Sequence, residues 1–557
     1  MFNAGAMEEA FSVSGNIVDV LNRRIFAGTL DIEQGRIARI REDNTIYGQY
    51  ICPGFIDAHV HVESSLLTPA EFARLAVVHG TVATVSDPHE IANVLGIAGV
   101  EFMLENASRV PFKFFFGAPS CVPATRFETA GAVLDVHAVE QLLQKKDIWY
   151  LSEMMNFPGV LQQDPDVMGK IALARQYGKP VDGHAPGLRG EQARRYAEAG
   201  ISTDHECTTL EEAQDKLNAG MHIIIREGSA ARNFDALIPL LKTYPDRIMF
   251  CSDDKHPDSL VAGHINELVK RAFSKGHLLF DVLRAACLNP IRHYKLPVGC
   301  LQIGDPADFI VLDNFERLHI LATYVEGKLV AREGKSLIPP VSSPAPNHFH
   351  PPKLKQEDLE VKAPSGSPCS IRVIEAIDGQ IVTGAAQAFA RIHDGKIISD
   401  TQQDILKLVV INRYKTARPA IAFIRGFGLK RGAIASSVAH DSHNLIAVGV
   451  NDEMILKAIQ AIVPHGGGLS VVHEHRQLVL PLPVAGLMSA EDGYAVARKY
   501  EQLDAEAKAL GSKLRAPFMT LSFMALLVIP RLKLSDQGLF DGELFQFVSL
   551  FTKNGQA

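Results

Sequence analysis

The chain has 557 residues, of which 47% are hydrophobic, and its formal net charge at pH 7 is -7. This length allows about three or four domains with sizeable apolar cores. Because no block of basic residues interrupts the sequence, the composition gives no electrostatic support for binding nucleic acid or an anionic membrane, and a small molecule is the expected partner.

The cysteines and the apolar segments indicate where the protein works. Seven cysteines lie far apart without a C-x-x-C pair, which favours a reducing, cytoplasmic compartment. The segment 1–9 lacks a basic region followed by an apolar core, so we expect no secretory signal there. The most apolar stretch, Phe518–Pro530, is too short to span a bilayer, and we predict that it is buried in a core.

Short apolar pieces separated by turns open the chain after about residue 11, for example in residues 14–19 and 35–40. The same pattern returns in Gly304–Asp313 and Ala322–Ala331. Such strands, found on both sides of a long middle region, can pair into one sheet. We therefore predict that residues 1–53 and 295–338 together form a small β-sandwich-like domain built from both flanks.

Between these flanks, in residues 54–294, strand-like runs alternate with helix-like ones. Repeated βα units predict a parallel sheet, and eight of them in roughly 240 residues predict an α/β fold with a TIM-like (β/α)8 barrel. The predicted strands are Gly54–His59, Thr81–Asp87, Phe112–Gly117, Trp149–Glu153, Pro180–His184, Ile201–His205, Met221–Arg226 and Ile248–Asp253.

Polar side chains fall at the carboxyl ends of these strands, where the active site of a barrel lies. His59 and His61 are two residues apart, so the period of a strand puts both imidazoles on one face. Any one such residue can be a helix cap or a solvated loop residue, but their joint placement favours a functional site. The polar residues at the later strand ends are His89, Glu90, Glu153, His184, His205, Arg226 and Asp253.

Four histidines and two carboxylates at barrel strand ends suit a pair of divalent transition-metal ions. Glu153 is placed at the centre, where a carboxylate can bridge two ions about 3.5–4 Å apart. A water held between them becomes hydroxide near neutral pH and is a ready nucleophile. Asp253 can bind one metal, accept the proton that this water releases and pass it to a leaving group. The pattern therefore predicts metal-assisted hydrolysis in a metal-dependent barrel.

The rest of the chain is a proline-rich linker, residues 339–369, and a domain of residues 370–557 whose alternating strand-like and helix-like runs predict an α+β fold. Within it, the stretch 438–444 sets His440 and His443 in one tight turn. One interpretation is a polar hairpin turn that satisfies its own backbone donors. The other is a cover over the barrel mouth, in which His440 and His443 hold an additional metal or hydrogen-bond the substrate.

Two sets of motifs point to a known family. The first set is Pro53-Gly-Phe-Ile-Asp-Ala-His-Val-His61, the later histidines and the aspartate of the eighth strand, within residues 11–335. The second set is His61-Val-Glu-Ser-Ser65, Ser86-Asp-Pro-His-Glu-Ile-Ala-Asn-Val94, Ser152-Glu-Met-Met-Asn156, Asp182-Gly-His-Ala-Pro186, Asp204-His-Glu206, Ser252-Asp-Asp254 and Val438-Ala-His-Asp-Ser-His-Asn444. The first set resembles the amidohydrolase superfamily, and the second resembles its bacterial adenine deaminase group. Many amidohydrolases bridge their metals with a carbamylated lysine, whereas the fourth strand here offers Glu153, as in the adenine deaminase group.

The resemblance implies hydrolytic deamination of adenine to hypoxanthine and ammonia, by attack of a metal-bridging hydroxide at C6 of the purine. It implies two divalent ions, manganese or iron with zinc as an alternative, and an assembly that we expect to be a homo-oligomer, namely a dimer. The metal ligands that it assigns are His59, His61, Glu153, His184, His205 and Asp253, of which Glu153, His205 and Asp253 are also the expected catalytic residues. The residues expected to bind the substrate are Glu63, His89, Glu90, Arg226, His440 and His443.

Three questions stay open at this level. Glu63, His89, Glu90 and Glu206 are all candidates for the residue that protonates N1 of the purine. Another cyclic amide or amidine hydrolase of the same superfamily would share the metal-site pattern. The chain could also be a non-catalytic scaffold of the same fold, and a scaffold of this kind would have lost metal ligands.

Overall fold

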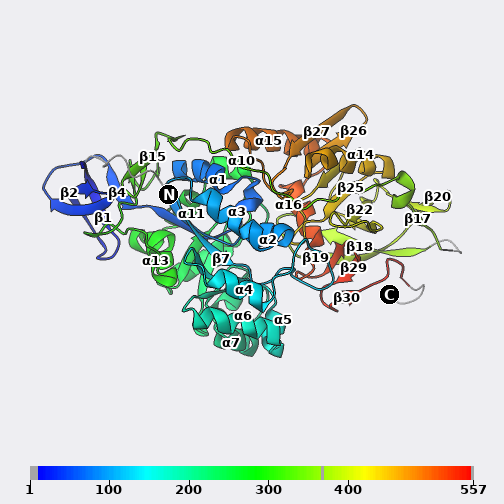
Figure 1. The fold of residues 1–557 in the computed structure, drawn as a ribbon, viewed down its shortest axis with the longest axis horizontal. Helices are drawn as coiled ribbons and strands as arrows, with labels where there is room; N and C mark the ends of the chain where they lie inside the picture. The colour runs from blue at the N-terminus through cyan, green and yellow to red at the C-terminus, as the bar shows by residue number, and fades with distance from the viewer. Residues whose placement is uncertain (1–9, 365–368, 553–557) are drawn as a thin grey trace.

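The computed structural model describes residues 10–364 and 369–552, and the segment 1–9, where we expect no secretory signal, lies outside these ranges. Three parts follow one another along the longest axis of the molecule (Figure 1). A small sheet lies at one end, a barrel in the middle and the C-terminal domain at the other end.

The middle of the chain forms a closed barrel of eight parallel strands. One run pairs β5-β6-β7-β8-β9 and a second pairs β10-β11-β12. The bridges Val181↔Ile201 and Val60↔Asp253 join the two runs at both seams. The strands are β5 (Phe55–Val60), β6 (Thr81–Ser86), β7 (Lys113–Ala118), β8 (Ile148–Met154), β9 (Val181–Gly183), β10 (Thr203–Asp204), β11 (His222–Arg226) and β12 (Ile248–Cys251). Each predicted strand overlaps one of these, so the predicted (β/α)8 barrel is confirmed.

The sequences of the first two barrel strands explain why they pack closely. Every residue of β5 and β6 is buried, as expected for parallel strands that are covered on both faces. Gly54 lies immediately before β5, and a Cβ atom there would lie 2.3 Å from a methyl carbon of Val82. Only glycine therefore allows the start of β5 to approach β6 so closely.

Helices surround the barrel and bury one face each. In α11 the buried residues Ile265, Leu268, Val269 and Ala272 recur at the spacing of an amphipathic helix. Asp135 and Asp164 cap α4 and α6 by accepting hydrogen bonds from backbone N–H groups of the first turn. The outer helices include α1 (Pro69–Ala76), α3 (Ile97–Ala107), α4 (Val136–Leu143), α6 (Pro165–Gln176), α7 (Gly190–Glu198), α8 (Leu210–Asn218) and α11 (Ile265–Ser274).

Both flanks of the barrel contribute to one eight-stranded sheet, in the order β16-β15-β14-β13-β4-β1-β2-β3. β4 is the junction, because it pairs parallel with β1 and antiparallel with β13. The sheet has its own apolar core, which includes Ile17, Leu30 and Phe309. Its strands are β1 (Phe11–Asp19), β2 (Arg24–Glu33), β3 (Arg36–Glu42), β4 (Tyr50–Pro53), β13 (Phe309–Leu312), β14 (Ile320–Val325), β15 (Lys328–Arg332) and β16 (Lys335–Ser336).

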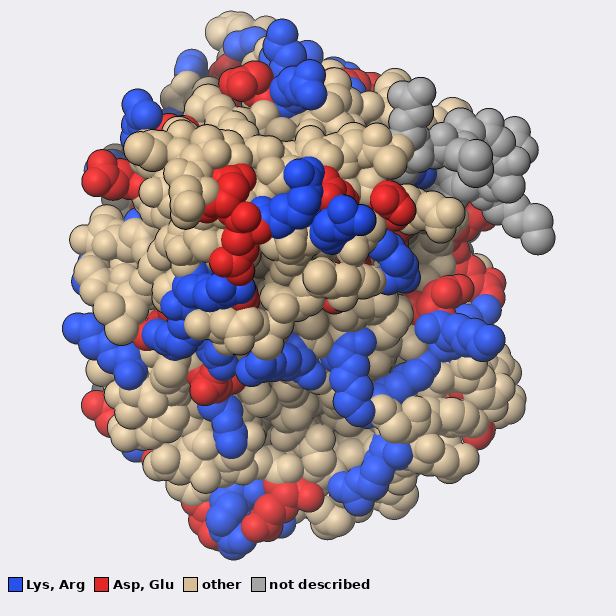
Figure 2. All heavy atoms as spheres, turned by 90° about the vertical axis from the view of Figure 1, so that its left-hand side faces the viewer, with Lys and Arg blue, Asp and Glu red and all other residues tan. Residues whose placement is uncertain are grey.

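The surface at this end of the molecule carries charges of both signs. Lys and Arg side chains lie beside Asp and Glu side chains in Figure 2, which views the molecule from that end. Two of the ion pairs there join Arg41 to Asp31 at 2.7 Å and Arg24 to Glu42 at 2.9 Å. Because the arginine of each pair is about half exposed, solvent and salt screen these pairs, and they contribute little to stability.

The chain after the small sheet runs across other parts of the molecule. Pro346 accepts a hydrogen bond from the backbone N–H of Ala485 at 2.8 Å, and the N–H of His350 donates to the carbonyl of Arg413 at 2.7 Å. A short helical turn (Gln356–Leu359) and β17 (Val361–Lys362) follow. The proline-rich segment therefore begins against the barrel, where Asn106 and Arg109 donate hydrogen bonds to Ser343 and Ser342, and continues along the C-terminal domain.

The C-terminal domain contains an eight-stranded sheet in the order β19-β18-β23-β22-β25-β24-β26-β27. The helices α14 (Asp452–Ile462) and α15 (Gly493–Ala509) pack against strands of this sheet, so the α+β prediction is confirmed. The strands are β18 (Ser370–Ala376), β19 (Thr383–Phe389), β22 (Leu406–Ile411), β23 (Ala420–Arg425), β24 (Ala433–Ser436), β25 (Leu445–Gly449), β26 (Gly468–His473) and β27 (Arg476–Pro481). A smaller sheet holds β28 (Leu532–Ser535), β29 (Gly538–Asp541) and β30 (Gln546–Phe547).

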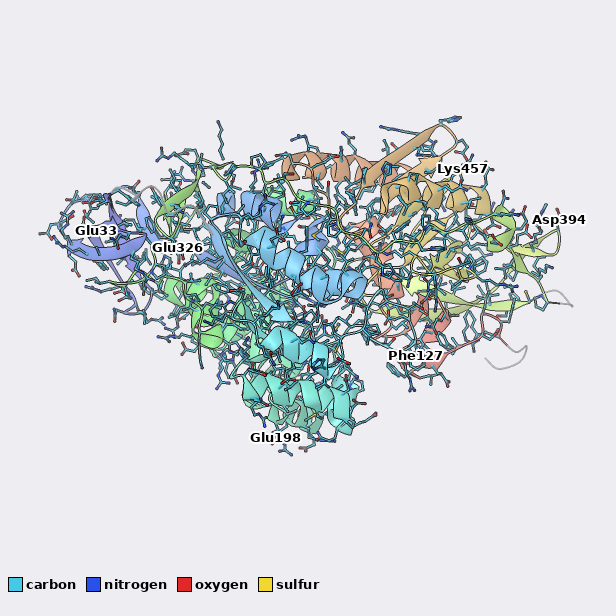
Figure 3. All side chains as sticks on the ribbon, viewed as in Figure 1. Glu33, Phe127, Glu198, Glu326, Asp394 and Lys457 are labelled. Atoms are coloured by element: carbon cyan, nitrogen blue, oxygen red, sulfur yellow. The ribbon has the colours of Figure 1, made fainter. Side chains whose placement is uncertain are left out.

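The C-terminal domain packs directly against the barrel. Phe127, in the long loop after β7, lies at this junction (Figure 3), and its ring contacts those of Phe540 and Phe547 with centroids 5.0 and 5.6 Å apart. On another side, Arg74 of α1 pairs with Asp492 at 2.8 Å. None of the helices in residues 10–364 and 369–552 combines the length and the apolar character needed to cross a membrane.

Candidate metal centre

The two histidines of the first strand converge as their spacing predicts. His59 lies in β5 and His61 follows its end, and both are buried. Their Nε2 atoms are 3.2 Å apart. No side chain fits between two imidazole nitrogens this close. Their separation is that of two ligands of a single metal ion.

Glu153 lies in β8 and faces histidines on both sides. Its Oε1 is 3.4 Å from Nε2 of His61, whereas its Oε2 is 2.8 Å from Nδ1 of His184 and 3.1 Å from Nε2 of His205. Each carboxylate oxygen therefore belongs to a different group of imidazoles. That arrangement is the one a carboxylate needs to supply an oxygen to each of two ions.

Asp253 completes the group at the seam where the end of β12 meets β5. Its Oδ1 is 3.3 Å from Nε2 of His61, and its Oδ2 accepts a hydrogen bond from Arg226 at 2.6 Å. Arg226 also forms a bidentate pair with Glu206, at 2.5 and 2.8 Å. Burial alone would raise the pKa of Asp253, but Arg226 and the neighbouring histidines lower it well below its usual value. Asp253 is therefore an ionised carboxylate.

These side chains fit divalent metal ions. Burial, followed by the proximity of His205, lowers the pKa of His59, so its imidazole is neutral and can act as a ligand. The donor atoms of His59, His61 and Asp253 lie within 4.8 Å of one another, and so do those of His59, Glu153 and His205. Buried nitrogen and oxygen donors in this number are the ligands that transition metals prefer.

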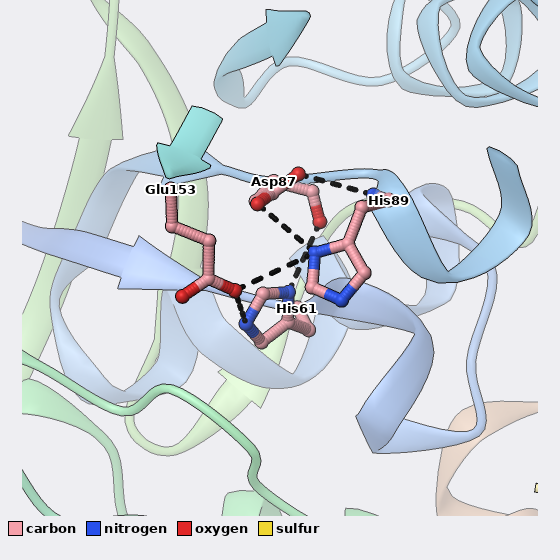
Figure 4. Close-up of side chains that lie close together, drawn as sticks. All are labelled: His61, Asp87, His89 and Glu153. Carbon is pink, nitrogen blue, oxygen red and sulfur yellow. Dashed lines mark hydrogen bonds and ion pairs between the residues drawn. The ribbon is translucent and has the colours of Figure 1, made fainter. Parts of the chain in front are cut away.

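Further contacts surround His61 (Figure 4). His89, the first residue of α2 (His89–Leu95), bonds through Nδ1 to Asp87 at 3.0 Å and lies 3.5 Å from Oε1 of Glu153. The backbone carbonyl of Asp87 contacts Nδ1 of His61 at 3.2 Å. His61, Asp87, His89 and Glu153 thus form another group with metal-ligand spacing. His89, which the sequence predicts to bind substrate, lies as close to Glu153 as the predicted ligand His61 does.

The predicted substrate-binding residues divide into two groups. A cavity above the predicted metal ligands is lined by His89, Glu90, Arg226 and His440. Glu63 and His443 are not among its lining residues. Glu63 accepts a hydrogen bond from the backbone N–H of Ile91 at 3.2 Å, and burial raises its pKa to about 7. His443 contacts Glu90 from the side of the C-terminal domain.

The structure also places residues at the cavity that the sequence does not predict there. Asp254 and Asp441 lie inside recognised motifs, so their positions were a usable signal. Met155 also lies in a recognised motif, whereas Ile381, Phe523 and Leu526 have no such signal. Phe518–Pro530 is buried as predicted, and part of it also lines the cavity. The additional lining residues are Met155, Asp254, Ile381, Asp441, Phe523 and Leu526.

Comparison with known proteins agrees with this architecture. The Amidohydrolase family model matches residues 50–330, so the barrel and its site define the chain as an amidohydrolase, a class that uses divalent metals. The Adenine deaminase C-terminal domain model matches residues 380–546. The chain belongs to the adenine deaminase family, because relatives of that name are 55% and 52% identical to it over nearly its full length.

Full-length relatives support this assignment. The chain is 55% identical over 547 residues to an adenine deaminase of Salinibacter ruber, covering 98% of this chain and 100% of the relative. It is 52% identical over 547 residues to an adenine deaminase of Methanosarcina mazei, covering 96% and 99%. A solved β-aspartyl dipeptidase of Fervidobacterium islandicum AW-1 aligns at 15% identity with a TM-score of 0.44, covering 59% of this chain and 98% of that one.

Proposed function

We propose that this protein catalyses the hydrolytic deamination of adenine to hypoxanthine and ammonia. The observation that carries the proposal is Glu153, whose two oxygens face separate groups of histidines at the barrel mouth of a chain that belongs to the adenine deaminase family. No predicted metal ligand is missing from this cluster, which argues against a non-catalytic scaffold.

The proposed site holds two divalent ions, manganese or iron with zinc as an alternative. Two ions bound there would lower the pKa of a bound water and make it a nucleophile at neutral pH. The residues that would hold them are His59, His61, Glu153, His184, His205 and Asp253. Imidazole-rich ligand sets of this kind accept several transition metals, so the choice depends on the metals available in the cell.

Asp253 has the geometry of a proton acceptor in this reaction. One of its oxygens faces the histidines and the other is held by Arg226, so the carboxylate cannot rotate freely. In the proposed mechanism, Asp253 takes a proton from the nucleophile and delivers it to the leaving amino group. Arg226 acts on the reaction by holding Asp253 in place.

The pocket above the ligands is the proposed purine site. Its walls combine charged groups, Glu206 and Arg226 among them, with apolar side chains of the C-terminal domain, Phe523 and Leu526. Such a mixture suits a small planar molecule with several hydrogen-bonding nitrogens. The C-terminal domain, proposed as residues 370–557, would cover this molecule and exclude water from the reaction.

We also propose a cytoplasmic, dimeric enzyme. All seven cysteines are buried and free, as suits a reducing compartment. The order of domains proposed here is a small β domain (1–53 and 295–338), the barrel (54–294), the linker (339–369) and the C-terminal domain. Analytical ultracentrifugation of the purified protein would test the dimer.

The activity can be tested by measuring ammonia release from adenine with enzyme stripped of metal by a chelator and reloaded with manganese or iron. We expect activity to return with two equivalents of metal per chain. A parallel panel of cyclic amides, such as hydantoin and dihydrouracil, tests the alternative. If the enzyme hydrolyses these cyclic amides but does not deaminate adenine, the proposed function becomes cyclic amide hydrolysis.

A further inference from the structure

Glu90 joins the barrel to the C-terminal domain through two histidines. It lies in the first turn of α2 and is 2% exposed. Nδ1 of His440 is 2.5 Å from one of its carboxylate oxygens, and Nε2 of His443 contacts the other. Both oxygens of Glu90 are thus occupied by side chains that lie 350 and 353 residues further along the chain.

The hydrogen bonds of His443 define its protonation. Its Nδ1 accepts a hydrogen bond from the backbone N–H of Ala439 at 3.2 Å, so this nitrogen carries no proton. Nε2 therefore carries the proton that it donates to Glu90. Although Glu90, His440 and His443 have metal-ligand spacing, a nitrogen that donates a proton cannot bind a metal ion. The three residues consequently form a hydrogen-bonded group.

Only one ring nitrogen of His440, Nδ1, contacts Glu90. Its other nitrogen, Nε2, is buried without a hydrogen-bond partner, and the side chain lines the cavity above the metal ligands. Its ring stacks on that of Phe523, with centroids 4.6 Å apart and planes at 19°, which restricts the direction of Nε2. A buried ring nitrogen without a partner, at the wall of the proposed purine site, is available to a bound ligand.

The charges around His440 favour its doubly protonated form. Burial alone would lower the pKa of His440, but Glu90, followed by Asp254 and Asp441, raises it to about 9. At neutral pH the ring therefore carries one proton on Nδ1, which it donates to Glu90, and a second proton on Nε2. The titratable groups that face the ring are Glu90, Asp254, Asp441, His443 and His256.

From this geometry we propose that His440 donates a proton to N1 of adenine and that Glu90 is the positioning residue for His440. The proposal rests on the deamination proposed above. N1 is the ring nitrogen bonded to C6, and it must gain a proton when C6 is attacked. Glu90 itself has no proton to donate to N1, because its two oxygens accept hydrogen bonds from the histidines.

The proton balance of the reaction is as follows. An oxygen–carbon bond forms at C6, the electron pair of the C6–N1 double bond moves to N1, and N1 takes the Nε2 proton of His440. The bond from C6 to the amino nitrogen then breaks, and this nitrogen leaves as ammonia with the proton held by Asp253. The proton left on the C6 oxygen returns to His440 through solvent. Adenine and water become hypoxanthine and ammonia, and both side chains are restored.

The test compares His440→Gln, Glu90→Gln and the parent as manganese-loaded enzymes, by ammonia release from adenine between about pH 6 and pH 10. His440→Gln keeps the volume of the side chain, and we expect kcat/KM to fall by about 10²–10⁴-fold while two metal equivalents remain bound. Glu90→Gln removes the charge that raises the pKa of His440, so the basic limb of the pH profile should move to lower pH. The matched control is His350→Gln, an exposed histidine bonded to Thr416, which should match the parent.

The outcomes separate the alternatives. A His440→Gln enzyme within tenfold of the parent, with the same basic limb, would overturn the proposal, and loss of metal from it would make His440 a ligand instead. If His440→Gln does not fold, the pH profile of Glu90→Gln decides, and an unshifted basic limb overturns the role of Glu90. If the folded, metal-loaded parent releases no ammonia from adenine, the proposed deamination is wrong. The proposed role of His440 as proton donor is then wrong as well.

Discussion

Asp253→Asn removes the proposed proton acceptor while keeping the shape of the side chain. In the parent, Oδ2 faces Arg226 at 2.6 Å and Oδ1 faces His61 at 3.3 Å. An asparagine has one oxygen, and Arg226 has no acceptor, so the amide oxygen must turn toward Arg226. The amide can still coordinate a metal ion weakly but cannot accept a proton, so we expect metal binding to be largely kept.

The size of the effect follows from this loss of acid–base chemistry. Positioned proton transfer contributes typically about 10²–10⁴-fold, so kcat should fall by at least that factor, about 2.7–5.4 kcal/mol in activation free energy. The melting temperature should change little, because Arg226 keeps its bidentate pair with Glu206. We would measure ammonia release, metal content and hypoxanthine binding by calorimetry on the same preparation.

The control for this variant is Asp235→Asn, an aspartate in α9 (Phe234–Leu237) that pairs with Arg271 and is 70% exposed. It should keep the activity of the parent. The reasoning fails if Asp253→Asn retains more than a tenth of the parent's kcat with two ions bound, because Asp253 would then carry no essential proton.

Three further predictions concern the bridge, the pocket cover and a buried acid. Glu153→Gln should bind fewer metal equivalents per chain, since an amide supplies only one oxygen, and elemental analysis showing two retained ions would remove Glu153 from the bridge. Replacing His440 and His443 together by alanine should lower kcat/KM for adenine far more than the melting temperature, and unchanged kinetics in a folded variant would make this turn purely structural. Glu128 has a pKa raised to about 8, first by burial and then by Asp441. Between about pH 4.5 and pH 8, the carboxyl group of Glu128 is protonated in the folded state but ionised in the unfolded state. The free energy of unfolding therefore falls as pH rises, by at most about 1.4 kcal/mol per pH unit. The stability of Glu128→Gln relative to the parent should therefore increase over this range. The same difference in melting temperature between the two proteins at pH 5 and at pH 8 would contradict this prediction.

The sequence by itself determined the barrel and the six ligands that we propose for it. The period of a strand places His59 and His61 on one face without any knowledge of the fold, and every later strand except the third brings a polar residue to the same end of the barrel. These features are local, since a residue at a strand end lies at the mouth of the barrel whichever loops connect the strands. For the same reason the eight strands and the α+β character of the C-terminal domain could be predicted.

Only the tertiary structure decided which partners these side chains have. Arg226, predicted to bind substrate, is paired with Glu206 and Asp253. Glu90 meets His440 and His443 because the C-terminal domain docks on the barrel, and no local pattern encodes a contact across 350 residues. The same docking turns part of an apolar core segment into the cover of the pocket. Hydrophobic burial is non-directional, so an apolar sequence predicts that a segment is buried but not which surface it meets.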